Sequence, residues 1–325
     1  MAIDRAPINT RIWSDGMHAR FKQGIVSRIV AMITLFIYTG WMHILFALMA
    51  LAILRCTWAI IALVGLYATL LLPPKPVLWG PFCRSWVFKT WREYFSFSYM
   101  FEEVLDPSKT YIFAEFPHGV FPMGPLLGAT ECQSMFPGFH IYGLAANVVF
   151  SVPFWRHFIA WLGSVPATTP HFKRVLRQGS VAVIVGGIAE MYMQDDRKEQ
   201  IMLRDRKGFV RVAVEEGVDG GIVPVYHFGN SRVLDFGPQV LSSLSRSMRA
   251  ALGFLYGTWY LPLPRPRPIY MVVGKPIPVP RLPRDDPKYE EVINEVHKRV
   301  CDALQQMYDD HKAEYGWADR PLMIN

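Results

Sequence analysis

Residues 29–72 form an apolar run that constrains this chain more than any other feature. The run has a single charged side chain, Arg55, and ends at two consecutive prolines. A helix over residues 29–54 would be roughly 39 Å long and one over residues 56–72 roughly 25 Å, against a hydrocarbon core of about 30 Å. Because only helices satisfy their main-chain polar groups in lipid, the run predicts a transmembrane helical hairpin that turns near Arg55.

Basic residues on both sides of the run set its expected orientation. Flanks rich in lysine and arginine stay on the cytoplasmic side, which is what two spans require. One long span is the alternative, and it would separate the two termini across the membrane. The hairpin divides the chain into a cytosolic segment (1–28), the hairpin (29–72) and a cytosolic-face domain (73–325). The flanking cations are Arg20, Lys22 and Arg28 before the run and Lys75, Arg84, Lys89 and Arg92 after it.

Composition narrows the range of partners. Hydrophobic residues make up 51% of the chain and charged residues 19%, against about 25% charged in soluble proteins, so we expect the large domain also to rest on the bilayer. The net charge of +7 fits anionic lipid, a phosphorylated cofactor or nucleic acid, and the hairpin makes nucleic acid the least favoured. The 4 cysteines lie far apart, so neither a metal site nor a disulfide framework is predicted.

The sequence predicts an α/β domain, because four apolar β-rich runs alternate with helix-like stretches. Runs of this length suit strands buried on both faces, and the alternation predicts a mixed, largely parallel sheet. Residues 82–103 mix aromatic and basic side chains and predict an interfacial helix, with an ordinary buried helix as the alternative. The predicted strands are 110–113, 181–185, 222–226 and 269–273, and the predicted helices are 147–162, 170–178, 207–216, 239–256 and 286–314.

Polar, glycine-bearing turns follow three of the predicted strands, at residues 115–119, 186–190 and 227–230. Ligands of open α/β sheets bind at the carboxyl ends of the strands, so we expect these turns to form one site. His118 is the candidate general base, since an imidazole with an ordinary pKa near 6.5 accepts a proton at neutral pH. A structural hydrogen bond is the alternative for this histidine.

Glu190 is the candidate partner that orients the imidazole or holds a substrate group. Gly186 and Gly187 before it are expected to let main-chain N–H groups face an oxyanion or a phosphate. A glutamate favoured by a helix N-terminus is the alternative. His227 either reaches this site or belongs to the core. The sequence has no GxSxG, HExxH, GxGxxG or GxxxxGK[ST] motif, which removes the usual support for hydrolases, metalloproteases and nucleotide-binding proteins.

Four cations surround the start of the helix predicted at 207–216, where the helix dipole disfavours positive charge. Binding the phosphates of a cofactor or of lipid would explain them, with a solvated basic face as the alternative. The cations are Arg204, Arg206, Lys207 and Arg211.

The turn FPHG at 116–119 resembles the HPHG motif of the type 2 diacylglycerol acyltransferase family, and other blocks of that family follow in order. These blocks are F-x2-P-x2-R-x6-G (Phe150, Pro153, Arg156, Gly163), GGxxE (186–190), RKGF (206–209), PVYHFGN (224–230), VGKPI (273–277) and HKxxYG (311–316).

The resemblance implies transfer of a fatty acyl group from acyl-coenzyme A to diacylglycerol, giving triacylglycerol. It implies a glycerolipid-acyltransferase-like domain anchored in the endoplasmic-reticulum membrane by a multi-pass segment, with cytosolic termini and a further location on lipid droplets. Acyl-coenzyme A is a co-substrate, and no cofactor is implied. His118 corresponds to the catalytic histidine. Together with the analysis of the turns and cations above, the predicted site has Glu190 as catalytic partner, and Phe116, Pro117, Gly119, Gly186, Gly187, Arg204, Arg206, Lys207, Arg211, His227, Gly229 and Asn230 in substrate binding.

Two departures from the family patterns affect the site. Phe116 stands where HPHG has its first histidine, so we expect it to shape an apolar path for the acyl chain or glyceride. Met123 stands where the broader glycerolipid acyltransferases have an aspartate, so the carboxylate partner of His118 is expected to be Glu190, or else Glu115.

Several alternatives stay open from the sequence. The acceptor is diacylglycerol, monoacylglycerol, a long-chain alcohol that gives a wax ester, or retinol. A lysophospholipid acyltransferase is less favoured, because the aspartate is missing. A non-catalytic hairpin protein that binds lipid is the alternative outside the enzymes.

Overall fold

A seven-stranded sheet forms the centre of the protein in a computed structural model that describes residues 23–248 and 252–325. The strand order is β1-β10-β7-β2-β5-β3-β4, and every neighbouring pair is parallel except β10 and β7. The mixed, largely parallel sheet predicted from the sequence is confirmed. Its strands are β1 (Ser98–Phe101), β2 (Tyr111–Phe116), β3 (Ile141–Ala145), β4 (Ser164–Pro166), β5 (Ser180–Ile184), β7 (Gly221–Phe228) and β10 (Tyr270–Val273).

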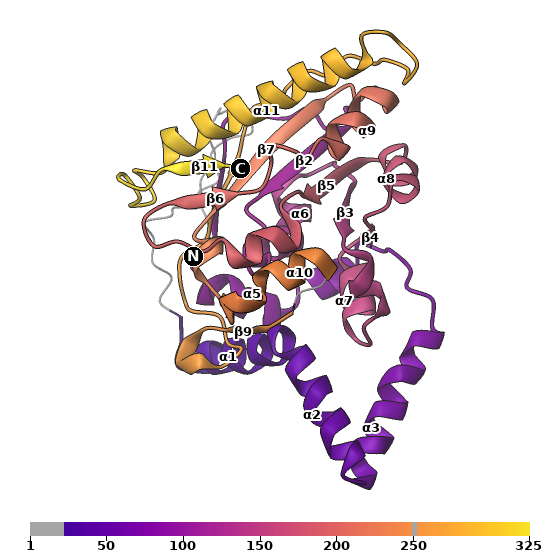
Figure 1. The fold of residues 1–325 in the computed structure, drawn as a ribbon, viewed down its shortest axis with the longest axis vertical. Helices are drawn as coiled ribbons and strands as arrows, with labels where there is room; N and C mark the ends of the chain where they lie inside the picture. The colour runs from indigo at the N-terminus through magenta and orange to yellow at the C-terminus, as the bar shows by residue number, and fades with distance from the viewer. Residues whose placement is uncertain (1–22, 249–251) are drawn as a thin grey trace.

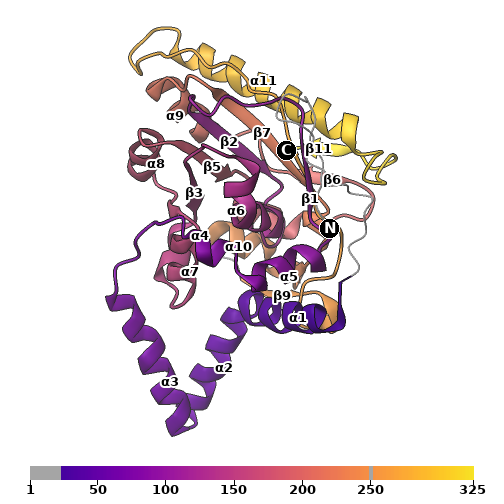
Figure 2. The ribbon, with the colours of Figure 1, turned by 180° about the vertical axis from the view of Figure 1, so that it is seen from behind.

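All four predicted strands are present, as β2, β5, β7 and β10. The central strands β2 and β7 are buried along their whole length, which explains their continuous apolar sequence. Helices α5 (Trp86–Tyr94), α6 (Met123–Met135) and α7 (Trp155–Trp161) contribute to the core on one face. Helices α8 (Thr169–Leu176), α9 (Gly208–Glu216) and α11 (Tyr289–His311) cover the other (Figures 1 and 2).

Several helix predictions need correction. The stretch 147–162 breaks at Phe154, which follows Pro153 and has a φ of 68°, so it forms η2 (Asn147–Ser151) and α7. The stretch 239–256 is a short α10 (Ser242–Met248) followed, beyond residues 249–251, by β9 (Phe254–Tyr256), which pairs with β8 (Asp235–Gly237). In a second small sheet β6 (Glu199–Ile201) pairs with β11 (Leu322–Ile324).

The aromatic segment 82–103 is mainly a buried element rather than an interfacial helix. It contains α4 (Gly80–Cys83) in part, α5 and strand β1. Phe88, Trp91 and Tyr94 of α5 are buried, and Trp86 is the aromatic residue of this helix that stays exposed. The alternative of an ordinary core helix is therefore the correct one.

The apolar run divides into three helices rather than two. Helix α1 (Ile25–Thr39) bends by 65° into α2 (Trp41–Ile53), and α3 (Thr57–Ala68) continues as η1 (Thr69–Leu71). The predicted turn near Arg55 is confirmed, but a single straight helix over 29–54 is wrong. The bend lies at Gly40, where a β-carbon would come within 2.9 Å of Pro262.

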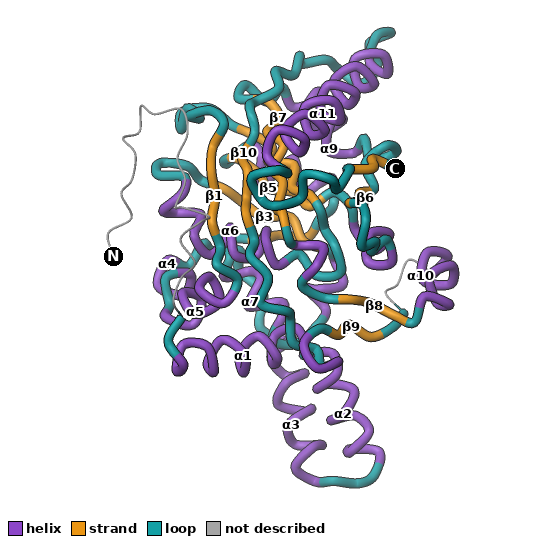
Figure 3. Tube along the Cα trace, turned by 90° about the vertical axis from the view of Figure 1, so that its left-hand side faces the viewer, coloured by secondary structure: helices purple, strands orange, loops and turns teal. Residues whose placement is uncertain are grey.

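Helix α1 packs on the domain, whereas α2 and α3 project away from it as a pair (Figure 3). Within the described residues no single helix is both long enough and apolar enough to cross a bilayer, although α1 and α2 meet these criteria together. The predicted cytosolic segment 1–28, with Arg20 and Lys22, lies almost wholly outside the described residues. The predicted membrane orientation therefore stays a prediction.

Gly124 in the first turn of α6 allows a close approach to β7, and this contact can be tested. A β-carbon there would lie 2.7 Å from the ring of the fully buried His227. We expect Gly124→Ala to lower the free energy of unfolding by about 1–3 kcal/mol, because a packed core has no room for the added methyl group. Thermal melting in detergent measures the change. Gly208→Ala is the matched control, since a β-carbon there meets nothing within 4 Å; equal melting of the two variants would contradict the expected clash.

Candidate active site

His118 lies in the turn between β2 and α6, with its side chain half-buried. The turn contains a cis peptide between Phe116 and Pro117, and Gly119 adopts a left-handed φ of 60°. The Nδ1 atom of His118 lies 2.9 Å from the carbonyl oxygen of Gly119. A carbonyl can only accept, so the neutral ring has its hydrogen on Nδ1 and leaves the lone pair of Nε2 available. Burial lowers the pKa of His118, which favours this neutral form.

The carboxylate of Glu190 holds the turn from one side. Glu190 lies in η3 (Gly187–Tyr192), directly after β5, and is 2% exposed. One oxygen accepts from the main-chain N–H of His118 at 2.6 Å and of Gly119 at 3.2 Å, and the other accepts from Met202 at 2.8 Å. The predicted contact with the imidazole is therefore replaced by contacts with the main chain. Burial raises the pKa of Glu190 to about 7, and the three main-chain hydrogen bonds oppose a further rise.

The two glycines before Glu190 have different roles. A β-carbon at Gly186 would lie 1.9 Å from the carboxyl carbon of Glu190, so only glycine leaves room for the carboxylate. Gly187 has space around it but adopts a φ of 71°, which other residues reach only with strain. Room for the Glu190 carboxylate therefore explains Gly186, and the predicted contact of main-chain N–H groups with an oxyanion or a phosphate stays a prediction.

Asn230 holds the turn from the other side. It follows β7 and is 1% exposed. Its side-chain amide donates to the carbonyl oxygens of Pro117 at 3.1 Å and of His118 at 3.2 Å, and its Oδ1 accepts from the N–H of Gly124 at 2.8 Å. The three turns that follow β2, β5 and β7 thus meet through the main chain around His118.

Other predicted site residues belong to the core. Phe116 is fully buried beside α9 and α11 residues, so its side chain is part of the core rather than of an acyl path. His227 is also fully buried, and its Nε2 lies 3.7 Å from Glu115, the reserve partner proposed for His118. Gly229 has a φ of 86°, and a β-carbon there would lie 2.2 Å from the carbonyl oxygen of Pro268, so it serves the turn.

The four cations predicted to bind phosphate divide into paired and exposed side chains. Arg211 makes two hydrogen bonds to Glu290 of α11, at 2.6 and 2.9 Å, which neutralises its charge and ties α9 to α11. Lys207 donates to Asn294 of the same helix at 2.7 Å. Arg204 and Arg206 are exposed on the segment that follows Met202, the third donor to Glu190. Glu290 would therefore compete with a phosphate for Arg211, whereas Arg204 and Arg206 are exposed; the phosphate-binding role stays a prediction.

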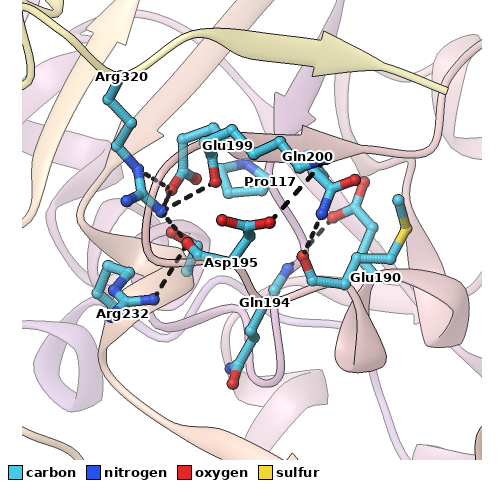
Figure 4. Close-up of a pocket in the computed structure, with 12 residues that line it drawn as sticks. Pro117, Glu190, Gln194, Asp195, Glu199, Gln200, Arg232 and Arg320 are labelled. Carbon is cyan, nitrogen blue, oxygen red and sulfur yellow. Dashed lines mark hydrogen bonds and ion pairs between the residues drawn. The ribbon is translucent and has the colours of Figure 1, made fainter.

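A polar cavity lies against the turn on the side of Pro117 and Gly119 (Figure 4). Its wall contains a buried ion pair between Arg320 and Glu199, at 2.6 Å, from outside the predicted site. The pair joins β6 to the segment before β11, which the order of motifs along the chain does not indicate. Among the described residues there is no group of three metal-ligating side chains. The cavity is lined by Pro117, Gly119, Glu190, Met193, Gln194, Asp195, Lys198, Glu199, Gln200, Ser231, Arg232 and Arg320.

Comparison with known proteins gives one family. The family model described as diacylglycerol acyltransferase matches residues 50–325. Among similar proteins are diacylglycerol O-acyltransferase 2-like protein 6 of Bos taurus (31% identical, covering 73% of this chain and 76% of that protein), acyl-CoA wax alcohol acyltransferase 1 of Homo sapiens (29%, 73% and 77%) and 2-acylglycerol O-acyltransferase 1 of Mus musculus (28%, 74% and 77%). No solved structure matches the chain.

The close contact between Gly186 and Glu190 gives a test of the clamp, the set of main-chain hydrogen bonds that the Glu190 carboxylate accepts from His118, Gly119 and Met202. In Gly186→Ala the methyl group displaces the carboxylate, which frees the N–H groups of His118 and Gly119. We expect hydrogen exchange of the peptide around residues 116–120 to speed up by at least about tenfold, the equivalent of one lost charged hydrogen bond. Gly187→Ala is the control, because it adds backbone strain of about 1–2 kcal/mol but no clash with the carboxylate. Equal exchange in both variants would contradict the assigned role of Gly186.

Proposed function

The chain belongs to the diacylglycerol acyltransferase family and is an O-acyltransferase, and from that premise we propose that it acylates diacylglycerol with acyl-coenzyme A to give triacylglycerol. The observation that supports this most is the neutral His118 ring, whose Nε2 is left unprotonated in a turn held on both sides. A base held in this way matches the demand of the reaction, in which a hydroxyl must lose its proton as it attacks a carbonyl.

In the proposed reaction Nε2 of His118 accepts the proton of the acceptor hydroxyl while its oxygen attacks the thioester carbonyl. A tetrahedral intermediate forms, and its collapse breaks the carbon–sulfur bond and releases the coenzyme A thiolate. The imidazolium then returns its proton to the thiolate or to water. A thiolate is a good leaving group, so the step needs no strong acid and no covalent enzyme intermediate.

Glu190 acts as a positioning residue in this mechanism. Its carboxylate fixes the main chain of His118 and Gly119, and so fixes the direction in which the ring points. Placement of a catalytic group within a fraction of an ångström affects rate strongly. The same carboxylate also anchors Met202, two residues before Arg204.

We assign the phosphates of acyl-coenzyme A to Arg204 and Arg206, with Lys207 beside them. Arginine matches phosphate geometry well, and both side chains are exposed. Arg211 is left out, because Glu290 already neutralises it. Pro117 and Gly119 also line the small cavity beside the turn.

The acceptor is the least constrained part of the proposal. The three similar proteins are named for diacylglycerol, wax alcohol and 2-acylglycerol, so a monoacylglycerol or a long-chain alcohol are the alternatives. The family description and the diacylglycerol name of one relative favour diacylglycerol. Initial rates with purified protein and a panel of the three acceptors decide between them.

We further propose that the protein is bound to the endoplasmic-reticulum membrane, with lipid droplets as a second location. The helices α2 and α3 expose large apolar side chains, as expected of segments that meet lipid rather than water. The multi-pass topology with cytosolic termini stays part of this proposal. The exposed side chains include Phe46, Met49, Ile53, Trp58, Ile61, Val64 and Tyr67.

Replacement of His118 tests the base directly. We expect His118→Ala to lower acyl transfer by about 10²–10⁴-fold, the usual contribution of a general base, with unchanged melting. The assay uses labelled acyl-coenzyme A and diacylglycerol in membranes. His140→Ala is the control, since His140 is exposed, is hydrogen-bonded to Tyr142 and lies before the start of β3, whereas His118 follows the end of the parallel strand β2. Normal turnover by folded His118→Ala protein would remove His118 as the base.

The pH dependence of the rate has a definite sign, because both groups act in their deprotonated forms. Activity should rise with pH through the pKa of Glu190, about 7, and the titration of His118 should lie below its ordinary pKa of 6.5. In Glu190→Gln we expect a lower maximal rate and loss of the limb near pH 7, while the limb at lower pH persists. A limb near pH 7 that survives in this variant would belong to another group.

A further inference from the structure

Two large aromatic side chains stand at the tip of the loop after β9. Trp259 is 71% exposed and Tyr260 is 87% exposed. Both residues have a φ of 57°, in the left-handed region that is sterically costly for residues other than glycine. Hydrogen bonds across the loop keep this conformation, including one from the N–H of Gly257 to Leu261 at 2.7 Å. A strained, closed loop that points aromatic rings outward indicates a function for those rings.

The loop lies beside the bend between α1 and α2, although it is far away in sequence. The Thr39 hydroxyl at the end of α1 donates to the carbonyl oxygen of Pro262, just after the aromatic tip. The rings of His43 and Phe254 lie 5.8 Å apart at the other side of the bend. The aromatic loop and the N-terminal helices are therefore one continuous surface.

Helix α1 contributes an apolar stripe to this surface. Its inner side, with Leu35 and Tyr38, is buried against the domain. Its outer side exposes isoleucines four residues apart, which is one face of a helix. Arg28 is exposed on the same helix. The stripe consists of Ile25, Ile29, Ile33 and Ile37.

We propose that Trp259, Tyr260 and the outer stripe of α1 form an interfacial docking face, which lies in the headgroup region of the phospholipid bilayer that α2 and α3 enter. This inference rests on the membrane-bound acyl transfer proposed above. Figures 1 and 3 show α1 and β9 on the side of the domain from which α2 and α3 project, with α11 on the opposite side.

Lipid is the occupant that fits the chemistry of this face. Tryptophan and tyrosine prefer the boundary between hydrocarbon and water, since their rings combine apolar and polar parts. An amphipathic helix with an exposed apolar stripe lies in the plane of that boundary, and Arg28 adds attraction to anionic headgroups. The face is also continuous with the exposed apolar side chains of α2.

Photo-crosslinking with the full chain in vesicles of phosphatidylcholine and phosphatidylserine tests the docking face. A benzophenone amino acid replaces Tyr260, or Phe46 on α2, or Gln306 on α11, one at a time. We expect lipid adducts from positions 260 and 46 and none from position 306. Adducts of position 260 with protein, including a second copy of this chain, would overturn the proposal, as would the absence of adducts at 260 when 46 gives them.

A paired glycine variant separates docking from folding. Trp259→Gly with Tyr260→Gly removes both rings but relieves the positive φ angles, so a merely structural loop would keep its stability. We expect the double variant to melt at an unchanged temperature and to keep its rate on a detergent-dispersed acceptor. With an acceptor in vesicles, kcat/KM should fall by about tenfold, because the reactive groups are then misplaced relative to the acceptor. An unchanged rate in vesicles would contradict docking, whereas inactivity of the wild-type protein toward every acceptor would contradict the proposed function instead.

Discussion

The buried carboxylate of Glu190 is the contact on which the site depends. It accepts main-chain hydrogen bonds from His118, Gly119 and Met202, and so joins the turns after β2 and β5 to the segment that leads into α9. Burying a carboxylate is costly, because water no longer solvates the charge. The pKa of Glu190 in the folded protein is about 7, above the ordinary 4.5. The contribution of the protonated carboxyl group to the free energy of unfolding is therefore complete below pH 4.5 and is lost as the pH rises through 7. By linkage the ionised clamp costs about 3 kcal/mol at high pH.

Several family blocks are parts of one structure around the histidine. Glu190 holds the N–H side of the turn, and Asn230 holds the carbonyl oxygens of Pro117 and His118. The glycine before the carboxylate leaves it room, and the glycine before the asparagine makes its turn. Fixing the main chain from both sides sets the position of the imidazole, which the proposed role of His118 as a base requires.

The sequence predicts the centre of the sheet well, because β2, β5, β7 and β10 are apolar along most of their length. Convergence of the three turns also follows from the parallel arrangement. The sequence does not show which atoms Glu190 contacts, because the order of residues along the chain cannot distinguish a contact with the ring of His118 from one with its main chain. The sequence also does not predict the ion pair between Arg211 and Glu290, because this pair requires α9 and α11 to lie side by side. Gly40 at the bend lies against Pro262, more than two hundred residues away, and a hydropathy pattern, which predicts one long helix, has no access to such a contact.

In the proposed membrane-bound enzyme, the bend between α1 and α2 would connect the position of the bilayer with that of the His118 turn. Tyr38 at the end of α1 packs its ring 5.6 Å from that of Phe121, which follows His118 by three residues. The indole of Trp155 donates to the carbonyl oxygen of Tyr38 at 3.2 Å, which ties α7 to the same point. A helix held in the plane of the bilayer would therefore fix the height of the His118 turn above the hydrocarbon core. An acceptor hydroxyl at the lipid–water boundary could then meet the imidazole while its acyl chains remain in the membrane, so the enzyme need not extract the glyceride into water.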